Sequence, residues 1–295
     1  MEAVALEKWN AIEIKNGNKL IARWPYYIGK RLGFGVMSNP MCTQTSGPWI
    51  DSSSSKYVNY ISKKKKMLEE LINKIPCHNV DIVLDSSNEY ILPFRWKGFR
   101  YEPTFSYRFT DLSNLDEIFS NISSSTRNHI KNAEQTLVVR DDMPIDVLID
   151  MQEQTFNRQK RKSPIPESLI RRLDEACLKH NARKLLVASD ESGNIHAARY
   201  FVYDNKICYS IMSGVNSNYM SSGASSLLRW KGIQFASKVS QIFDFEGSNI
   251  EGIEQNVRSF GSGYVFNYRV YRLNLLLEMA DVMKPHVKKF IGYKI

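Results

Sequence analysis

The stretch that decides the fold, residues 184–215, reads KLLVASDESGNIHAARYFVYDNKICYSIMSGV. It holds three apolar runs typical of strands, at residues 184–189, 196–203 and 207–215. The connections between them, 190–194 and 204–205, are short and rich in Gly, Asn and Asp, as antiparallel hairpins require. The sequence therefore predicts three antiparallel strands in series.

Helices and further strands are predicted on both sides of these three strands. In chain order we expect a strand at 136–140, helices at 145–159 and 166–178, the three strands, a helix at 224–239, a strand at 241–245, a helix at 250–259, an extended stretch at 264–273 and a helix at 275–290. Contiguous strands followed by crossover units indicate a mixed α/β class, α+β in character, with a mixed sheet.

The N-terminal part predicts a hairpin around Asn16-Gly17-Asn18, a helix at 56–75 and strands at 80–84 and 99–109. Helical periodicity then runs through residues 115–135, and we predict a single helix there. A domain boundary is expected just before that helix, which gives domains of residues 1–112 and 113–295.

The composition excludes several classes of protein. With 43% hydrophobic and 12% aromatic residues and only 15 Gly and 10 Pro in 295, the chain is neither disordered nor collagen-like. The absence of an apolar run of ~18 residues and of a signal-peptide pattern predicts a cytoplasmic protein without a membrane span. Four irregularly spaced Cys and five scattered His predict that no metal is bound.

The charge balance points to an anionic partner. Lys and Arg number 40 against 31 Asp and Glu, which gives a formal net charge of +9. A basic surface of this kind favours a phosphate-bearing ligand, an RNA, or peripheral association with an anionic membrane face. Composition alone does not choose between them.

A loop of small residues at 221–226 leads into the helix predicted at 224–239. Gly223, Ala224 and Ser225 would let a ligand approach the backbone, where free N–H groups and the helix dipole favour a phosphate. The alternative is an ordinary helix start whose serines act as N-caps.

A pair of carboxylates closes the strand predicted at 241–245. In the hexapeptide FDFEGS at 243–248, Asp244 and Glu246 share one face of the strand, and Phe243 and Phe245 share the other. Carboxylates at this end of a strand lie in the usual crevice of an open α/β sheet, where one can accept a proton and the other can orient a ligand. The alternative is that one caps the next helix and the other pairs with an Arg.

Other candidates are weaker. Arg158 opens the basic run 158–162, which suits phosphate binding but also a solvated helix end. Trp96 and Phe99 suit a core, a cleft wall or a platform for stacked bases. No Gly-x-Ser-x-Gly, Walker or Gly-x-Gly-x-x-Gly motif is present, which argues against hydrolases, NTPases and dinucleotide-binding enzymes.

The order of elements over 136–273 resembles the GNAT acyltransferase fold, and several motifs resemble its FemAB-like branch, which contains peptidoglycan-bridge aminoacyltransferases. The motifs are WP at 24–25, GP at 47–48, PFRWKGF at 93–99, TRNHIKNA at 126–133, QTFNRQ at 154–159, SGASSLL at 222–228, FDFEGS at 243–248, IEGIE at 250–254 and RSFG at 258–261.

The resemblance implies tandem GNAT-like domains, the first degenerate, that face a shared cleft and transfer an acyl or aminoacyl group to an amine. It implies that the strands ending at 215 and 245 splay apart, so that backbone amides orient the carbonyl of the donor. The residues implied in donor binding are Ser213, Gly214, Val215, Gly223, Ala224 and Ser225. The residues implied in substrate or charge contacts are Arg158, Arg258, Trp96 and Phe99.

We therefore predict an acyltransferase that moves an acyl group from acyl-CoA or another acyl thioester to a primary amine of a metabolite or cell-envelope precursor. Asp244 and Glu246 are its expected catalytic residues. An aminoacyl-tRNA-dependent transferase that forms peptide bonds is the alternative, although no RNA-binding arm is seen in the sequence. A non-catalytic GNAT-like binding module is a second alternative, because residues 256–261 lack the family's Tyr and residues 220–225 lack its full pyrophosphate motif.

Overall fold

The computed structural model describes residues 1–51, 56–247 and 251–290. The chain divides into two compact units, which we call the first and the second unit. The first combines Met1–Thr104 with the segment that begins at Phe266, and the second is Phe105–Val265. The chain passes between them within strands β6 (Arg100–Phe109) and β12 (Gly263–Arg272).

The first unit is built on a mixed sheet with strand order β1-β2-β3-β5-β12. The predicted hairpin is confirmed as β1 (Trp9–Asn16) and β2 (Lys19–Arg31), which pair antiparallel. The other strands are β3 (Phe34–Ser38), the short β4 (Trp49–Ile50), which pairs with β2, and β5 (Val80–Leu84). The short helices are α1 (Glu2–Ala5) and α3 (Leu92–Trp96).

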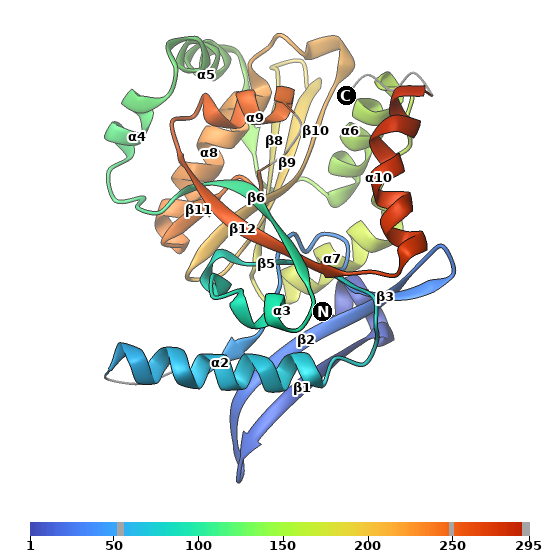
Figure 1. Cartoon of the computed structure of the whole chain (residues 1–295). Coiled ribbons are helices and arrows are strands. Elements are labelled where there is room, and N and C mark those ends of the chain that lie inside the picture. Colours follow the sequence, from blue (N-terminus) through green and yellow to red (C-terminus); the bar gives the residue numbers. More distant parts are fainter. Residues whose placement is uncertain (52–55, 248–250, 291–295) are drawn as a thin grey trace. The chain divides into compact units, whose positions relative to one another are not determined.

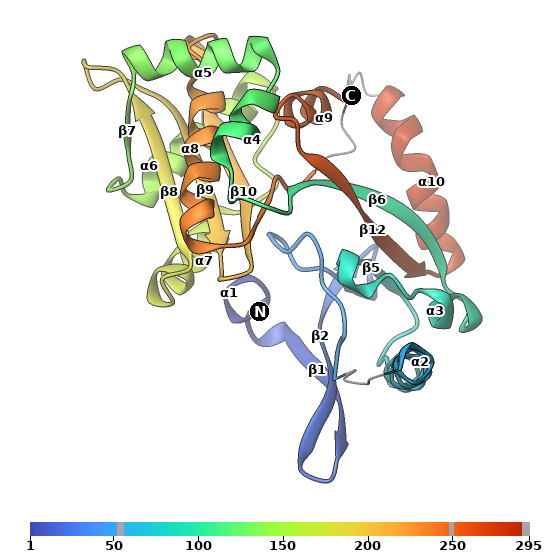
Figure 2. The same ribbon diagram turned by 90° about the vertical axis from the view of Figure 1, so that its left-hand side faces the viewer.

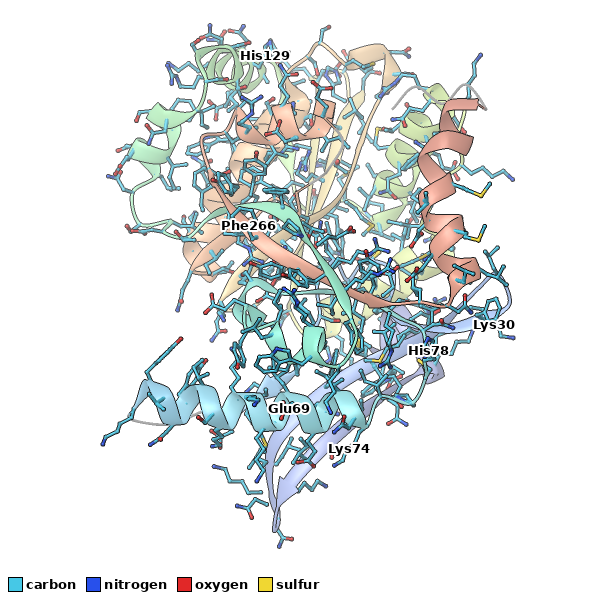
Figure 3. The ribbon with its side chains drawn as sticks, in the orientation of Figure 1. Lys30, Glu69, Lys74, His78, His129 and Phe266 are labelled. Carbon is cyan, nitrogen blue, oxygen red and sulfur yellow. The ribbon has the colours of Figure 1, made fainter. Side chains whose placement is uncertain are left out.

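Helix α2 (Tyr57–Asn73) has one apolar face, which covers the core of the first unit. Met67, Leu68, Leu71 and Ile72 recur at helical spacing and are buried with Trp24. Among the charged side chains of α2, Lys65 and Lys66 are exposed, whereas Lys64 is buried; Figure 3 labels Glu69 on the helix and Lys74 just beyond its end. The helix predicted at 56–75 is thereby confirmed.

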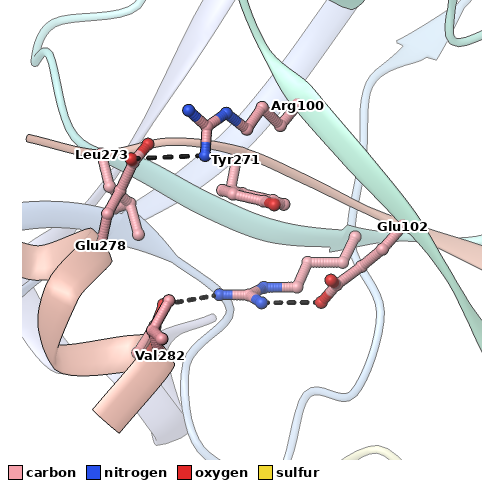
Figure 4. A pocket seen from close by; sticks show the side chains of 8 residues that line it. Arg100, Glu102, Tyr271, Leu273, Glu278 and Val282 are labelled. Atoms are coloured by element: carbon pink, nitrogen blue, oxygen red, sulfur yellow. Dashed lines mark hydrogen bonds and ion pairs between the residues drawn. The ribbon is translucent and has the colours of Figure 1, made fainter.

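A network of ion pairs holds the last helix, α10 (Leu275–Phe290), to the sheet of the first unit. Arg269 of β12 donates to Asp81 of β5 at 2.6 Å, to Glu102 of β6 at 2.7 Å and to Asp281 of α10 at 3.0 Å. Arg269, Glu102 and Asp281 are among the residues that line a small pocket of about 220 Å³, in which each guanidinium faces a carboxylate (Figure 4). Hydrogen bonds from Arg269 to these carboxylates raise the pKa of its guanidinium, so the positive charge is balanced within the network.

The second unit has the strand order β6-β11-β10-β9-β8-β7. The three predicted strands are confirmed as β8 (Arg183–Ser189), β9 (Ile195–Tyr203) and β10 (Ile207–Val215), and each pairs antiparallel with the next. The remaining strands are β7 (Val138–Arg140) and β11 (Ile242–Asp244), and β11 runs parallel to β10. The α/β class with a mixed sheet is confirmed.

Helices cover both faces of this sheet (Figure 1). Helix α8 (Ala224–Val239) packs so closely on one face that a Cβ on Gly232 would lie 2.2 Å from the ring of Phe201. Helices α6 (Ile145–Arg158) and α7 (Glu167–Lys179) cover the other face, and there a Cβ on Gly214 would lie 2.3 Å from the backbone of α6. Each approach depends on a glycine at the contact.

Strand β10 contains a one-residue bulge in its pairing with β9. Ser210 faces Phe201 and Met212 faces Tyr200, so Ile211 has no partner of its own. The bulge changes the alternation of side chains, and Gly214 consequently points at α6 while Ser210 lies on the face covered by α8.

The single helix predicted at 115–135 is wrong. The segment forms α4 (Leu115–Asn121) and α5 (Ser124–Thr136), separated at Ile122 and Ser123. Ser123 is the N-cap of α5, and its hydroxyl accepts from the N–H of Thr126. The periodicity hid this break because the apolar residues continue in phase across it, whereas a local Ser cap starts a new helix.

The predicted domain boundary at 112 and 113 stays a prediction, but the compact units divide the chain elsewhere. Residues 264–273, expected in the second domain, form most of β12, and β12 pairs with β5 through Tyr268–Arg272 in the first unit. Helix α10 follows β12 into the same unit.

Candidate active site

The end of β11 leaves β10 and follows β6 instead. Pairing between β10 and β11 stops at Tyr209 and Asp244, although β10 continues to Val215. Beyond that point, the N–H of Phe245 donates to the carbonyl of Tyr107 on β6 at 2.9 Å. The splay that the resemblance implied is therefore present, and its cause is the pairing of this segment with β6.

Asp244 joins β11 to β6 through buried side chains. It is 2% exposed, and its carboxylate accepts from the hydroxyl of Ser106 at 2.5 Å and from Nε of Arg108. The backbone N–H of Glu246 donates to the same carboxylate at 2.7 Å. Asp244 thus accepts three hydrogen bonds, of which the one from Arg108 is also an ion pair, so both of its oxygens are engaged within the protein.

Glu246 lies on a strained turn that these contacts hold in place. Its φ of 53° is in the left-handed region, which costs a non-glycine residue on the order of 1 kcal/mol. The next residue, Gly247, donates its N–H to Ser106 at 3.1 Å, and a Cβ there would lie 2.6 Å from the carbonyl oxygen of Phe105. The loop is therefore fixed against β6.

The carboxylate of Glu246 is electrostatically unusual. Burial and the nearby charge of Asp244 raise its pKa to about 8. Among the described residues its side chain makes no hydrogen bond or ion pair. A half-buried carboxylate without a partner, with a pKa near neutrality, is suited to accept and release protons.

The predicted phosphate loop is partly covered by α5, which lies across the start of α8 (Figure 2). Gly223 has a φ of 76°, and a Cβ there would lie 2.5 Å from the carbonyl oxygen of His129 on α5. Ala224 is 2% exposed. A phosphate placed over Gly223 would meet that carbonyl oxygen, so the turn itself does not fit the phosphates of a donor.

A polar pocket lies where α5, α8 and α9 (Glu251–Arg258) meet, and Ser226, the residue after Ser225, is one of those that line it. Its volume is about 340 Å³. The residues that line it are Ser123, Ser125, Thr126, His129, Ser226, Gly252, Gln255, Asn256 and Ser259. Hydroxyl, amide and imidazole groups line this pocket, and none of these residues is acidic.

The strand residues expected to orient the carbonyl of the donor have partners of their own. The N–H of Val215 donates to the hydroxyl of Thr155 on α6 at 2.9 Å, and Gly214 packs directly on the backbone of α6. Ser213 is half-buried and pairs with Arg199 of β9. All three lie beyond the last residue of β10 that pairs with β11.

The four residues predicted to contact substrate are scattered. Arg158 ends α6 and is exposed, and Arg258 ends α9 in an ion pair with Glu254 at 3.0 Å. Trp96 and Phe99 belong to the first unit, where Phe99 is 4% exposed in the core beside Phe94. Phe99 therefore matches the alternative interpretation, a core aromatic residue.

Sequence reasoning missed Ser106 and Arg108, which hold Asp244, and two buried arginines, Arg199 and Arg229. Arg199 is 5% and Arg229 8% exposed. The signal for Arg199 was available, since this charge interrupts the apolar strand 196–203. No local signal marked Ser106 or Arg108, because they lie 138 and 136 residues from Asp244.

Two absences hold for the part of the chain that the structure describes. It contains no cluster of three His, Cys, Asp or Glu side chains arranged to hold a metal ion. None of its helices combines the length and the apolar character that crossing a membrane requires.

Most of the second unit resembles a known protein family. Residues 120–249 match the family model for the acetyltransferase (GNAT) domain. This stretch of the second unit is similar to a GNAT domain. The match confirms the resemblance to GNAT proteins and, with it, the prediction of an acyl or aminoacyl transferase. The turn with Asp244 and Glu246, the start of α8 and both buried arginines lie within the matched residues.

Solved structures share the fold beyond the GNAT domain. FemX matches with a TM-score of 0.69 and 10% identity over 95% of this chain and 92% of that chain. The C-terminal domain of a putative lysylphosphatidylglycerol synthetase from Agrobacterium fabrum matches with a TM-score of 0.57 and 11% identity, over 94% and 89% of the two chains. L-PGS from Bacillus licheniformis gives 0.55 and 14%, over 99% and 92%. No curated protein matches the sequence.

Replacing Asp244 by Asn tests the buried ion pair of the GNAT domain. The change leaves Arg108 buried without a counter-charge, so we expect the free energy of unfolding to fall by about 3–5 kcal/mol. Urea denaturation of both proteins measures the difference. The control is Asp142→Asn, which breaks the exposed pair with Arg140 and should leave stability unchanged. Equal effects of the two substitutions would contradict the role given to Asp244.

The raised pKa of Glu246 predicts how stability depends on pH. Folding moves this pKa from 4.5 to about 8, so the folded protein binds the proton more tightly between these values. The contribution of the carboxyl to stability is therefore complete below pH 4.5 and is lost as the pH rises to about 8. Glu246→Gln should match the native protein near pH 4.5 and be more stable at pH 8.5, by urea denaturation. Glu175→Gln, on the exposed face of α7, should show no such divergence.

Proposed function

We propose that this chain transfers an acyl or aminoacyl group from a phosphate-bearing donor to a primary amine, with Glu246 as the proton acceptor. The observation that carries the proposal is the Glu246 carboxylate, whose pKa of about 8 suits a general base near neutral pH. The GNAT domain supports the reaction class. The position of Glu246, just beyond the point where β10 and β11 part, supports its role.

The chemical step needs no covalent intermediate on the protein. The amine nitrogen attacks the carbonyl carbon of the donor, a C–N bond forms, and the C–S bond of a thioester or the C–O bond of an ester breaks. Ionised Glu246 takes the proton that the amine loses and returns it to the departing thiolate or alkoxide. The reaction is therefore balanced without an external acid or base.

Asp244 has a different part in this proposal. Its carboxylate is already engaged by Ser106, Arg108 and the backbone of Glu246, so it acts as a positioning residue. It fixes the strained turn, and its negative charge adds to the effect of burial, which is the larger cause of the raised pKa of Glu246. Of the two carboxylates that the sequence predicted to be catalytic, Glu246 is thus proposed to transfer the proton and Asp244 to position it.

The donor is either an acyl thioester such as acyl-CoA or an aminoacyl-tRNA. GNAT domains generally use acyl-CoA, which supports the first. Two observations support the second. The turn at Gly223 is covered by α5, and one similar structure is named a putative lysylphosphatidylglycerol synthetase, a name that implies an aminoacyl product. For the acceptor we keep a primary amine of a metabolite or cell-envelope precursor.

Thermal unfolding with each donor discriminates between these alternatives. Coenzyme A, acetyl-coenzyme A and bulk tRNA are added at two salt concentrations. Stabilisation by the coenzymes that survives high salt identifies a thioester donor. Stabilisation by tRNA that is lost at high salt identifies an aminoacyl donor, because phosphate contacts release counterions. A chain that responds to none of them is not the proposed transferase, and the binding module becomes the better description.

Glu246→Gln tests the chemistry with whichever donor binds. Loss of a general base lowers kcat/KM by about 10²–10⁴-fold. In the native protein kcat/KM should rise with pH to a plateau, with an apparent pKa of about 8, because the ionised carboxylate is the active form. Glu175→Gln serves as the control and should retain both rate and profile. If Glu246→Gln kept the native rate and pH profile, the rise of kcat/KM with pH would reflect ionisation of the amine substrate. Glu246 would then not be the base.

A further inference from the structure

Helix α10 turns most of its large apolar side chains outward. Those of its first turns that are each more than half exposed are Leu275, Leu276, Met279, Val282 and Met283. Successive residues of an α-helix are about 100° apart, so these side chains form one continuous stripe about 120° wide, which we call the α10 stripe. A surface helix ordinarily buries a stripe of that width against a core.

The opposite side of α10 meets its sheet with charged groups. Glu278 pairs with Arg100 at 3.3 Å. Asp281 accepts from Arg269 at 3.0 Å. Leu277 is the apolar residue on this side, and it is buried in a small apolar cluster. Ion pairs therefore contribute much of the attachment of α10, and its apolar stripe is left exposed to a partner.

The hairpin tip between β2 and β3 adds an exposed leucine next to this helix. Leu32 opens the two-residue turn, is 67% exposed and has a φ of 49°. Asn and Gly suit such a turn, so a bulky apolar residue is kept there against the preference of the backbone. Phe34 packs against the cluster that contains Leu277, and Arg31 donates to Asp281. The tip is thus attached to the first turns of α10.

Positive charge accompanies these apolar side chains. Lys30, labelled in Figure 3, precedes the hairpin tip and is exposed, and the side chain of Arg100 is 67% exposed. Both acids of α10 are engaged by arginines. The sequence of the helix continues with Lys284, Lys288 and Lys289 and contains no further acid. Apolar residues combined with lysines are typical of helices that lie on anionic lipid surfaces.

The net charge distinguishes between two partners that could cover the α10 stripe. The chain has a formal net charge of +9, so a second copy would bring the same charge to the same face. An anionic bilayer brings the opposite charge, and its interfacial region takes up apolar side chains from a helix that does not cross it. Charge complementarity therefore favours the lipid surface.

We propose that the α10 stripe and Leu32 dock the first unit onto the surface of an anionic lipid bilayer. The helix lies in the plane of that surface, with the stripe at the boundary of headgroups and acyl chains and the lysines toward the lipid phosphates. This contact explains why an apolar stripe and a strained leucine are kept exposed side by side. It goes beyond the proposed transfer reaction and does not depend on Glu246.

Co-sedimentation of the full chain with lipid vesicles tests the proposal without requiring turnover. Vesicles of phosphatidylcholine are compared with vesicles that hold an equal amount of phosphatidylglycerol, which has no amine and so cannot be the acceptor of the proposed reaction. The native chain should bind the mixed vesicles roughly 10-fold more tightly or better, because each cation near the surface adds to the attraction. High salt should remove most of that preference.

Val282→Gln tests the α10 stripe, and Val58→Gln is its matched control. Val282 is 70% exposed on α10 and Val58 is 73% exposed on α2 of the same unit, so neither substitution opens a core. Val282→Gln should weaken binding to the mixed vesicles by roughly 10-fold, because one apolar side chain no longer leaves water. Leu32→Gln should have a similar effect, whereas Val58→Gln should bind as the native chain does.

Several outcomes would overturn the proposal. One is a native chain that binds neither kind of vesicle, or binds both equally. Another is equal binding by Val282→Gln and Val58→Gln. Analytical ultracentrifugation without lipid supplies the remaining one, since a native dimer that Val282→Gln dissociates would assign the α10 stripe to a second copy. None of these measurements uses a donor, so they stand or fall separately from the transfer reaction.

Discussion

The buried ion pair between Asp244 and Arg108 is the interaction on which the candidate site depends. It joins the last residue of β11 to β6, and through Ser106 it also fixes the loop that follows. Because this segment follows β6, it leaves β10, and the two strands part. The same carboxylate holds the backbone of Glu246 in its strained conformation and contributes to the raised pKa of its side chain. The ion pair thus sets the geometry of the turn, and its carboxylate adds to the effect of burial on the pKa of Glu246.

Charges in the second unit fall into two groups with different consequences. Arg108 and Arg183 have carboxylate partners and stabilise the fold. Glu246 has no partner among the described residues, so burial disfavours its ionised form. Arg199 and Arg229 have only uncharged partners there, so their charges are kept at a cost to stability. Such costs are typical of positions where a protein must bind or exchange something, and both kinds lie around the ends of β11 and the start of α8.

The sequence predicted the elements better than the contacts between them. Short connectors rich in Gly, Asn and Asp defined β8, β9 and β10, because local turn chemistry determines hairpins. The helix at 224–239 was also predicted correctly, whereas the cap at Ser123 was overlooked. The partners of Asp244 and the packing of α5 on Gly223 join residues far apart in the chain, so no local pattern could reveal them.

The bulge at Ile211 makes the effect of a deletion in β10 depend on which residue is lost. Without Ile211, Ser210 and Met212 would be neighbours opposite Phe201 and Tyr200, so the pairing with β9 would become regular and every later side chain would keep its face. Loss of Ser213 would instead bring Val215 to the position of Gly214, where the backbone of α6 lies 2.3 Å from a Cβ. A deletion at the bulge therefore changes the pairing locally, whereas a deletion after it exchanges the faces of all the side chains that follow.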